Sequence, residues 1–282
     1  MKTISKIFIF VIIAIILIAI FLLLKNNGQK NLEVTFFDVG QGDSALIKTP
    51  YGQDIIIDGG PDNIVISKLG ENLGFFDNDI ELMILTHPHA DHVTGLIEIL
   101  KRYDVEKIIY TGIVYDSLVY KTFLEAASKE EAQIIIADKK QRIVLGDDLY
   151  LDILYPESDI SNVIEDNVNN TSIVARLVHG ENSFLFMGDA EGEEELEIID
   201  DGGLESDVLK LAHHGSKTND REFIDIVSPR YTIISVGIKN KFGHPNLGVM
   251  NMLSEIGTKT FRTDKLGDIS FFSDGHNIGE VY

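Results

Sequence analysis

The chain has 282 residues, 44% of them hydrophobic, which is enough for one large domain or two small ones. It contains no cysteine, and this excludes disulfides, thiolate metal ligands and a lipoprotein anchor. Its 45 acidic residues against 24 basic ones give a formal net charge of −21, which excludes a broad basic face for nucleic acid. Any nucleic-acid substrate would therefore be held by metal ions and a few local lysine or arginine residues.

The amino-terminal segment contains an uninterrupted apolar run of 18 uncharged residues, from Ile7 to Leu24. At about 1.5 Å per residue, a helix of this length just crosses a bilayer core of roughly 30 Å. Lys2 and Lys6 precede the run and no small-residue cleavage site precedes Lys25, which favours an uncleaved single-pass anchor over a cleaved secretory signal. We expect a cell-membrane protein with its main domain outside the cytoplasm; a secreted protein is the alternative.

Beyond a short polar linker the composition does not change again, so we expect an anchor and linker over residues 1–30 and one domain over residues 31–282. Short apolar or β-branched runs bounded by turn residues predict strands at 32–38, 44–48, 54–58, 80–85, 107–110, 132–137, 142–145, 148–155, 172–179, 183–187, 208–212, 231–236, 259–262 and 269–272. Amphipathic stretches predict helices at 63–73, 94–103, 117–129, 191–199, 220–227 and 246–255. This alternation predicts a mixed α/β domain.

The densest group of candidate ligands is the run Thr-His-Pro-His-Ala-Asp-His at residues 86–92. It lies between a predicted buried strand and a predicted helix, on a loop where side chains can converge. Imidazole nitrogens and carboxylate oxygens are ligands of zinc and similar divalent ions. We expect His87 and His89 to bind one ion, and Asp91 and His92 to face a second.

Two later strands also end in candidate ligands. Asp189 follows the apolar run 184–187 and Gly188, and we expect it to bridge the two ions; as an alternative it would cap the helix that follows. His213 and His214 follow the apolar run 208–212, and adjacent side chains on an extended segment point in opposite directions. We assign His214 to the metal and His213 to the substrate, and the reverse assignment stays open.

Seven motifs follow one another along residues 32–275: FFDVGQGDS at 36–44, DGG at 58–60, THPHADH at 86–92, Asn-Asn-x-Ser at 169–172, Gly-Asp at 188–189, HHGS at 213–216 and FGHPN at 242–246. Together they resemble the metallo-β-lactamase domain of the ComEC family of competence DNA-uptake proteins. The resemblance implies a four-layer αββα sandwich and two divalent metal ions. ComEC proteins are polytopic channels, whereas this chain has one hydrophobic segment, so a role in DNA transport does not follow.

The resemblance also assigns roles to further residues. The superfamily usually completes its first metal site with a third histidine, but residues 166–174 contain none. Asn170 could offer a carbonyl oxygen there, which would favour manganese beside zinc; the alternative is that these asparagines only shape a turn. Asp58 is expected to support the histidine loop, and Asp38 and Asp43 to shape the first loop beside the metals. His244 is expected to approach the substrate, or to be a satisfied loop histidine.

The function that we expect is hydrolysis of a phosphodiester, with DNA as the first substrate, at two ions bridged by Asp189. Asp91 would orient the attacking water, and His213 or His244 would protonate the leaving oxygen or hold the phosphoryl group. The alternatives are a phosphoesterase for a small or cell-wall diester, similar to the phosphorylcholine esterases, a β-lactam or thioester hydrolase, and a non-catalytic metal-binding module. The sequence identifies no protein partner.

Overall fold

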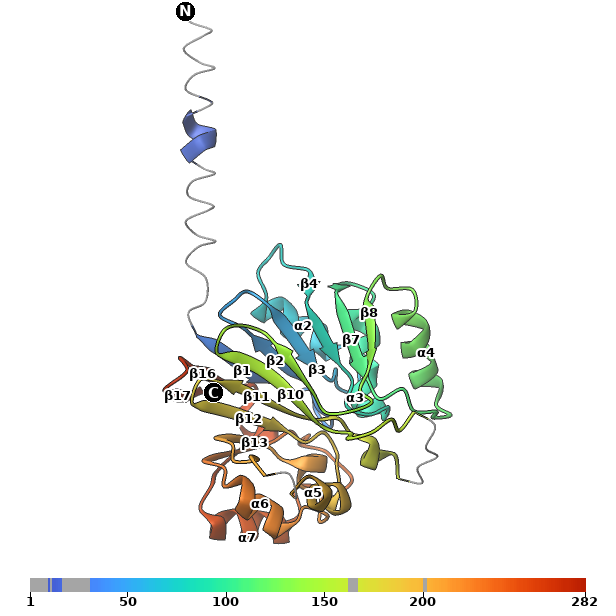
Figure 1. Ribbon diagram of the computed structural model, residues 1–282, viewed down its shortest axis with the longest axis vertical. Coiled ribbons are helices and arrows are strands. Elements are labelled where there is room, and N and C mark those ends of the chain that lie inside the picture. Colours follow the sequence, from blue (N-terminus) through green and yellow to red (C-terminus); the bar gives the residue numbers. More distant parts are fainter. Residues whose placement is uncertain (1–9, 11, 17–30, 162–166, 200–201) are drawn as a thin grey trace, which may run out of the picture.

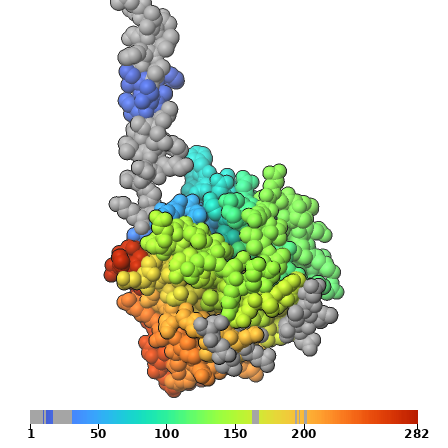
Figure 2. Space-filling view, in the orientation of Figure 1, coloured from blue at the N-terminus to red at the C-terminus, as the bar shows by residue number. Residues whose placement is uncertain are grey.

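The computed structural model describes residues 10, 12–16, 31–161, 167–199 and 202–282, and they form two facing sheets with helices on their outer sides (Figure 1). The first sheet has eight strands in the order β17-β16-β1-β2-β3-β5-β7-β8. The second has seven, in the order β15-β14-β13-β12-β11-β10-β9, and β4 and β6 form a separate pair. The space-filling view shows the two parts of the domain packed against each other, blue to green above and yellow to red below (Figure 2).

The strands of the first sheet are β1 Leu32–Phe36, β2 Ala45–Lys48, β3 Asp54–Ile57, β5 Leu82–Ile84, β7 Lys107–Tyr110, β8 Gln133–Ile136, β16 Ile269–Ser273 and β17 Ile278–Val281. Those of the second are β9 Gln141–Val144, β10 Leu149–Tyr155, β11 Val174–His179, β12 Asn182–Phe186, β13 Val208–Lys210, β14 Tyr231–Ile234 and β15 Lys259–Arg262. The pair is β4 Asp79–Ile80 with β6 Asp104–Val105. The helices are α2 Ile64–Asn72, α3 Ala90–Ile99, α4 Leu118–Ala127, α5 Gly192–Ile199, α6 Arg221–Val227, α7 Leu247–Ile256 and α8 Thr263–Leu266.

The strands are apolar on both faces because each sheet is covered on both sides. In β3, Ile55 and Ile57 belong to the core between the sheets, whereas Ile56 packs with the outer helices α2, α3 and α4. This alternation is the two-residue period of a strand. Between the sheets, the ring centroids of Phe36 and Phe186 lie 5.8 Å apart. Figure 1 shows α5, α6 and α7 on the side of the second sheet that faces away from the first. The four layers confirm the αββα sandwich.

Strand direction explains where a site can form. Strands β12, β13 and β14 are mutually parallel, and so are β3, β5 and β7. The carboxyl ends of parallel neighbours meet at one edge of a sheet, and the loops that leave them converge there. The segments that follow β3, β5, β12, β13 and β14 carry most of the candidate site residues.

The elements differ from the sequence prediction at a few places that matter. The helix predicted at 94–103 begins earlier, at Ala90, so Asp91 and His92 lie in its first turn and not on a loop. The strand predicted at 208–212 ends at Lys210, and residues Ala212–Gly215 form a 3-10 turn, η2. Strands β4, β6 and β17, helix α8 and the 3-10 turn η1, Val168–Thr171, were not predicted. All are short and have no periodic pattern.

The predicted membrane anchor over residues 7–24 lies largely outside the described residues. Within the part of the chain that the structure describes, no helix is both long and apolar enough to cross a bilayer. The anchor and the domain limits 1–30 and 31–282 therefore stay predictions.

Candidate metal centre

The connection from β5 to α3 brings four potential ligands together. His87 is buried, and its Nε2 lies 3.1 Å from Nδ1 of His89, which is partly exposed. Asp91 and His92 follow in the first turn of α3, where the partial positive charge of the helix N-terminus favours a carboxylate. Gly42 allows the first loop to approach this turn, because a Cβ there would lie 2.2 Å from the backbone oxygen of Asp91.

Asp58, at the end of β3, holds this connection in place from beneath. One carboxylate oxygen accepts from the backbone N–H of Thr86 at 2.8 Å, and the other accepts from the Thr86 hydroxyl at 2.7 Å and from Nδ1 of His92 at 2.8 Å. Because Nδ1 of His92 donates to this carboxylate, its Nε2 is left facing the centre without a proton when the ring is neutral. Asp58 therefore contacts the histidine connection directly, and its supporting role in a metal site stays a prediction.

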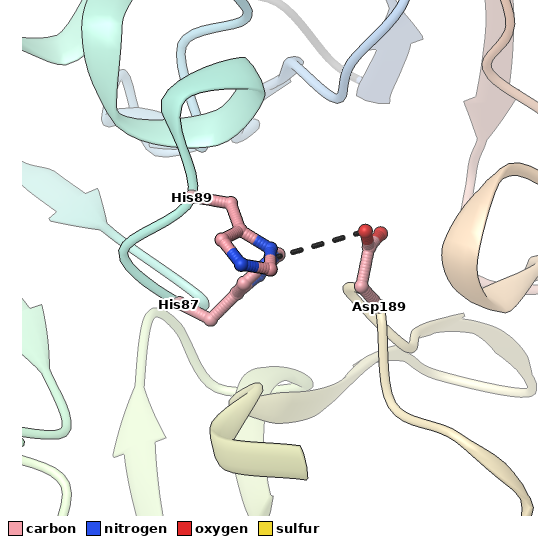
Figure 3. A group of neighbouring side chains, drawn as sticks. All are labelled: His87, His89 and Asp189. Atoms are coloured by element: carbon pink, nitrogen blue, oxygen red, sulfur yellow. Dashed lines mark hydrogen bonds and ion pairs between the residues drawn. The ribbon is translucent and has the colours of Figure 1, made fainter. Parts of the chain in front are cut away.

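Asp189 occupies the middle of the group and comes from the second sheet, after β12. Its side chain is buried, with Oδ1 3.3 Å from Nε2 of His92 and Oδ2 3.8 Å from Nε2 of His87 and 3.6 Å from Nε2 of His214. Figure 3 shows the carboxylate of Asp189 opposite the rings of His87 and His89. One carboxylate therefore faces histidines from both ends of the centre, which is the position that a bridging ligand needs.

The His213–His214 pair does not have the extended backbone that we expected. Their φ angles are +45° and +53°, in the left-handed region, which costs on the order of 1–3 kcal/mol for each residue and is typical of functional sites. His214 is buried, with Nδ1 donating to the carbonyl of Ser235 at 2.9 Å and Nε2 3.4 Å from Asp91. His213 is partly exposed, and its Nε2 lies 3.9 Å from Asp189. The prediction of an extended backbone at this pair is therefore wrong. His214 nevertheless lies among the candidate ligands, and His213 lies at the open side of the site.

At the position without a histidine, the structure brings Asn169 to the site where we had expected Asn170. The side-chain oxygen of Asn170 accepts from Nδ2 of Asn167 at 3.2 Å and so belongs to the turn. Asn169 is buried, and its Nδ2 lies 3.1 Å from Glu191 and 3.4 Å from Nδ1 of His213. Asn169 and Asn170 both lie within the 3-10 turn η1, where neighbouring side chains point in different directions about the turn. Glu191, which also accepts from Nδ1 of His213 at 3.1 Å, was not predicted; its place two residues after Asp189 was the available signal.

A second unpredicted residue, Lys210, lies beneath the centre. Its ammonium is buried at the end of β13 and lies 2.6 Å from one oxygen of Asp43, whose other oxygen lies 3.3 Å from Nδ1 of His214. Its signal in the sequence was a lysine inside the apolar run 208–212. Asp38 has a local role, as its side chain accepts from the backbone N–H of Gly40 at 3.1 Å. The structure thus places Asp43 under His214 and Asp38 in the turn of the first loop.

His244 lies at the mouth of the site, on the loop between β14 and α7. Its ring centroid is 5.3 Å from that of His213 and 6.3 Å from that of His214. Burial lowers its pKa below the ordinary value, which leaves a neutral ring at neutral pH. His244 is therefore placed to meet a substrate together with His213.

The arrangement fits divalent metal ions. In the described residues, four groups of three have ligand atoms within 4.8 Å of one another, and two of these groups consist of predicted ligands: His87, His89 and Asp189, and Asp91, His92 and His214. Among the ten buried polar atoms of the described residues that have no hydrogen-bond partner, four belong to candidate ligands: Nε2 of His92, Nε2 of His214, Oδ1 of Asp189 and Oδ1 of Asn169. Leaving such atoms unpaired costs about 1–3 kcal/mol each, whereas coordination of a cation would satisfy them all. Nitrogen and carboxylate oxygen are suitable ligands for zinc, manganese or iron.

The protonation equilibria show a cation-binding environment. Burial pushes the pKa of His87 well below its usual range, so its ring is neutral, the form that binds a metal. Burial would also lower the pKa of His214, but the carboxylates of Asp189 and Asp43 raise it to about 10. The same histidines hold the pKa of Asp189 well below its usual value, against the effect of burial. The carboxylates thus favour positive charge in the site, and a metal ion would displace protons as it binds.

Comparison with known proteins defines the class of this fold and site: residues 37–238 match the metallo-beta-lactamase superfamily, and the chain belongs to it. The chain is 30% identical over 259 residues to ComE operon protein 3 of Bacillus subtilis, a match that covers 85% of this chain and 33% of that protein. It is 29% identical over 264 residues to Competence protein ComA of Neisseria gonorrhoeae, covering 92% of this chain and 35% of that protein. Both are competence proteins of the ComEC type, which agrees with the resemblance seen in the motifs. The chain spans about a third of their length.

Among solved structures, YhfI of Bacillus subtilis, a metallo-beta-lactamase fold protein, superimposes with a TM-score of 0.55 and 12% sequence identity. The match covers 89% of this chain and 100% of YhfI. At this identity the likeness concerns the fold, and it confirms the sandwich architecture independently of the motifs.

Proposed function

We propose that this protein is a two-metal phosphodiesterase that cleaves DNA. The observation that carries the proposal is the position of Asp189, whose carboxylate faces His87 on one side and His92 and His214 on the other. Such a shared carboxylate is the element that a two-ion centre requires. The nearby polar groups on the open side, His213 and His244, are suited to an anionic substrate.

Two divalent ions, zinc or manganese, would supply Lewis acidity at the phosphoryl oxygens and a water of lowered pKa. His87, His89, Asp189 and Asn169 would hold one ion. Asp91, His92, His214 and Asp189 would hold the other. An amide in place of the usual third histidine makes the first set harder, which favours manganese over zinc at that end.

The chain's own residues supply orientation and proton transfer. Asp91 has a side chain that is 32% exposed, lies 3.4 Å from Nε2 of His214, and is ionised because hydrogen bonding to His214 lowers its pKa in spite of burial. Its carboxylate is therefore available to accept a hydrogen bond from a water and orient it. His213, held by Glu191, and His244 can donate hydrogen bonds to the phosphoryl group, and His213 can pass a proton to the leaving oxygen.

DNA is proposed as the substrate because the relatives include a competence protein and because the motifs resemble those of ComEC. The apolar run at residues 7–24 supports a membrane-anchored enzyme with this domain outside the cell. One observation favours a second candidate, a phosphoesterase for a small or wall-attached diester: the net charge of −21 repels long polyanions.

The test is cleavage of single-stranded DNA, double-stranded DNA and bis(4-nitrophenyl) phosphate by the full chain, with and without manganese or zinc. Asp189→Ala and His214→Ala should lose all three activities. His276→Ala, an exposed histidine outside the site, is the matched control and should retain them. Hydrolysis of the small diester with DNA intact would reject the nuclease and favour the second candidate. No hydrolysis of any substrate by metal-loaded protein would reject both.

A further inference from the structure

We propose that the loop between β14 and α7, residues 237–246, binds a nucleic-acid strand next to the metal centre, with phosphates on Lys239 and Lys241 and a base on Phe242. This inference rests on the proposed function and names a substrate-holding surface for it. We refer to residues 237–246 as the rim loop. Nothing in the metal centre itself requires the side chains of these three residues.

The first observation is a group of free positive charges. Lys239 and Lys241 are exposed, as is Lys217 just after the His213–His214 turn, and none of the three has an ion-pair partner among the described residues. Elsewhere, exposed lysines such as Lys101 and Lys121 pair with neighbouring carboxylates. In a chain with so large an excess of acid, unpaired cations beside the site offer local attraction for phosphates without a broad basic face.

The second observation is an exposed aromatic ring that follows Lys241 in the rim loop and lies beside His244. Phe242 is 70% exposed, and its ring centroid lies 5.9 Å from that of His244. The ring of His244 is in turn 5.3 Å from that of His213, whose Nε2 lies 3.9 Å from Asp189. A base stacked on Phe242 would therefore be separated from the proposed metal bridge by two histidines. Aromatic–base stacking contributes about 1–3 kcal/mol per base and tolerates any sequence.

The third observation is that the rim loop is held in one shape. The side-chain oxygen of Asn240 accepts from the backbone N–H groups of Phe242 and His244, at 3.3 and 3.1 Å. Its nitrogen donates to the carbonyls of Gly237 and His244, at 3.0 and 2.8 Å. The backbone N–H of Asn246 donates to Gly215 at 2.8 Å, which ties the loop to the histidine turn. Lys239, Lys241 and Phe242 are thus presented by a preorganised backbone, which lowers the entropic cost of binding.

The opposite wall of the site has a different character. Tyr115 lies there with its ring 5.9 Å from His89, and Val114 and Leu118 are exposed. The nearest charged residue in that segment, Asp116, is acidic and pairs with Lys121. A polyanion would therefore be held on the rim-loop side. Since a stacking ring needs an unpaired base, the geometry favours a single strand at this loop over an intact duplex.

The experiment measures binding and cleavage with the full chain. A fluorescent oligothymidylate and its duplex are titrated in EDTA, and cleavage of DNA is compared with that of bis(4-nitrophenyl) phosphate. The variants are Lys239→Gln/Lys241→Gln, Phe242→Ala and Phe242→Trp. The control, Lys101→Gln/Lys129→Gln, removes the same charge from the ends of α3 and α4 that lie away from the site.

We expect the double lysine variant to weaken oligonucleotide binding about tenfold relative to the control, and the slope of log affinity against log salt to fall by about 1.4. Phe242→Ala should weaken single-strand binding about tenfold, and Phe242→Trp should restore it. The ratio of DNA to small-diester turnover should fall with binding. If the unmodified chain binds the strand through these residues but cleaves no DNA, the inference stands and the nuclease proposal fails.

Three results would overturn the inference. One is equal oligonucleotide affinity for the variants and the control. Another is an equal loss of DNA and small-diester turnover in the variants, which would place these residues in the metal centre. The last is binding of polyglutamate of matched charge as tight as that of the oligonucleotide and equally sensitive to the variants, since that would define a general polyanion surface.

Discussion

The two sheets contribute to the candidate metal centre in different ways. The first sheet supplies His87, His89, Asp91 and His92 from one connection between β5 and α3. The second sheet supplies Asn169, Asp189 and His214 from three connections that are distant in the sequence. The first group is positioned by local structure and one supporting carboxylate, Asp58. The second depends on the register of parallel strands, on a left-handed turn and on a buried ion pair. A centre shared by both groups therefore requires that the two sheets pack in one fixed relation.

The largest effect should come from the residue that links the two groups. Asp189→Asn keeps the size of the side chain but removes the charge that faces histidines of both ends, so we expect turnover of bis(4-nitrophenyl) phosphate to fall on the order of 10³-fold. His89→Ala affects only the ion proposed at His87 and His89 and should leave the ion at Asp91, His92 and His214 bound. Comparable metal contents for the two variants would show that Asp189 does not link the groups.

The second-sheet group should depend on Lys210. Lys210→Met leaves the buried carboxylate of Asp43 without its partner at 2.6 Å, so we expect the free energy of unfolding to fall by about 3 kcal/mol. Urea unfolding measures this. Lys101→Met, which removes an exposed lysine from a surface pair, should change stability by less than about 1 kcal/mol. Equal losses of unfolding free energy in the two variants would show that the buried Lys210–Asp43 ion pair contributes no more to stability than a surface pair.

The first-sheet group should depend on Asp58. Asp58→Asn weakens its contact with Nδ1 of His92 and with Thr86, and we expect metal affinity to fall about 10- to 100-fold, with the ion near His92 lost first. Competition with a metal-sensitive dye measures the two dissociation constants. Unchanged affinity at both positions would mean that the histidine connection keeps its shape without this carboxylate.

A smaller effect concerns the pH dependence of stability, which should depend on a carboxylate at the end of β3 that lies away from the metal centre. Asp54 begins β3, at the end away from Asp58; burial raises its pKa to about 7, and the carboxylates of Asp77 and Glu81 add to this. Because the folded state binds this proton more tightly than the unfolded state, stability should be highest below about pH 4 with respect to this group and fall as pH rises toward 7. Asp54→Asn should remove this fall, about 1 kcal/mol after allowance for solvent screening, in urea unfolding at pH 5.5 and 8. An identical pH dependence in the variant would assign the fall to other groups.

Most of this architecture could be predicted from the sequence. Strands that are covered on both sides are continuous apolar runs, which are easy to recognise, and glycines mark the ends of several of them. The grouping of His87, His89, Asp91 and His92 was predictable because all four lie within one short run of the sequence. The second-sheet residues were harder. Asn169 is turned into the site by a four-residue 3-10 turn, and His213 and His214 have positive φ angles, so neither follows from an assumption of extended chain. Lys210 lies within the apolar run 208–212, but the sequence does not say which way its side chain points, and only the fold shows that it is buried.

The helix start at Ala90 was missed for a related reason. Pro88 and the polar residues after it resemble a loop, but the turn begins there because the chain must carry Asp91 and His92 back over the first loop at Gly42. The close contact is a tertiary effect that no local pattern contains.

The most direct test of the shared centre is the number of ions that activate the unmodified chain. Metal-free protein is titrated with manganese, and bound metal and bis(4-nitrophenyl) phosphate turnover are measured on the same samples. The account predicts that turnover rises with a second equivalent of bound metal and is absent or small with one. Full turnover at one equivalent, or binding of no more than one ion at saturation, would contradict a centre built jointly by the two sheets around Asp189.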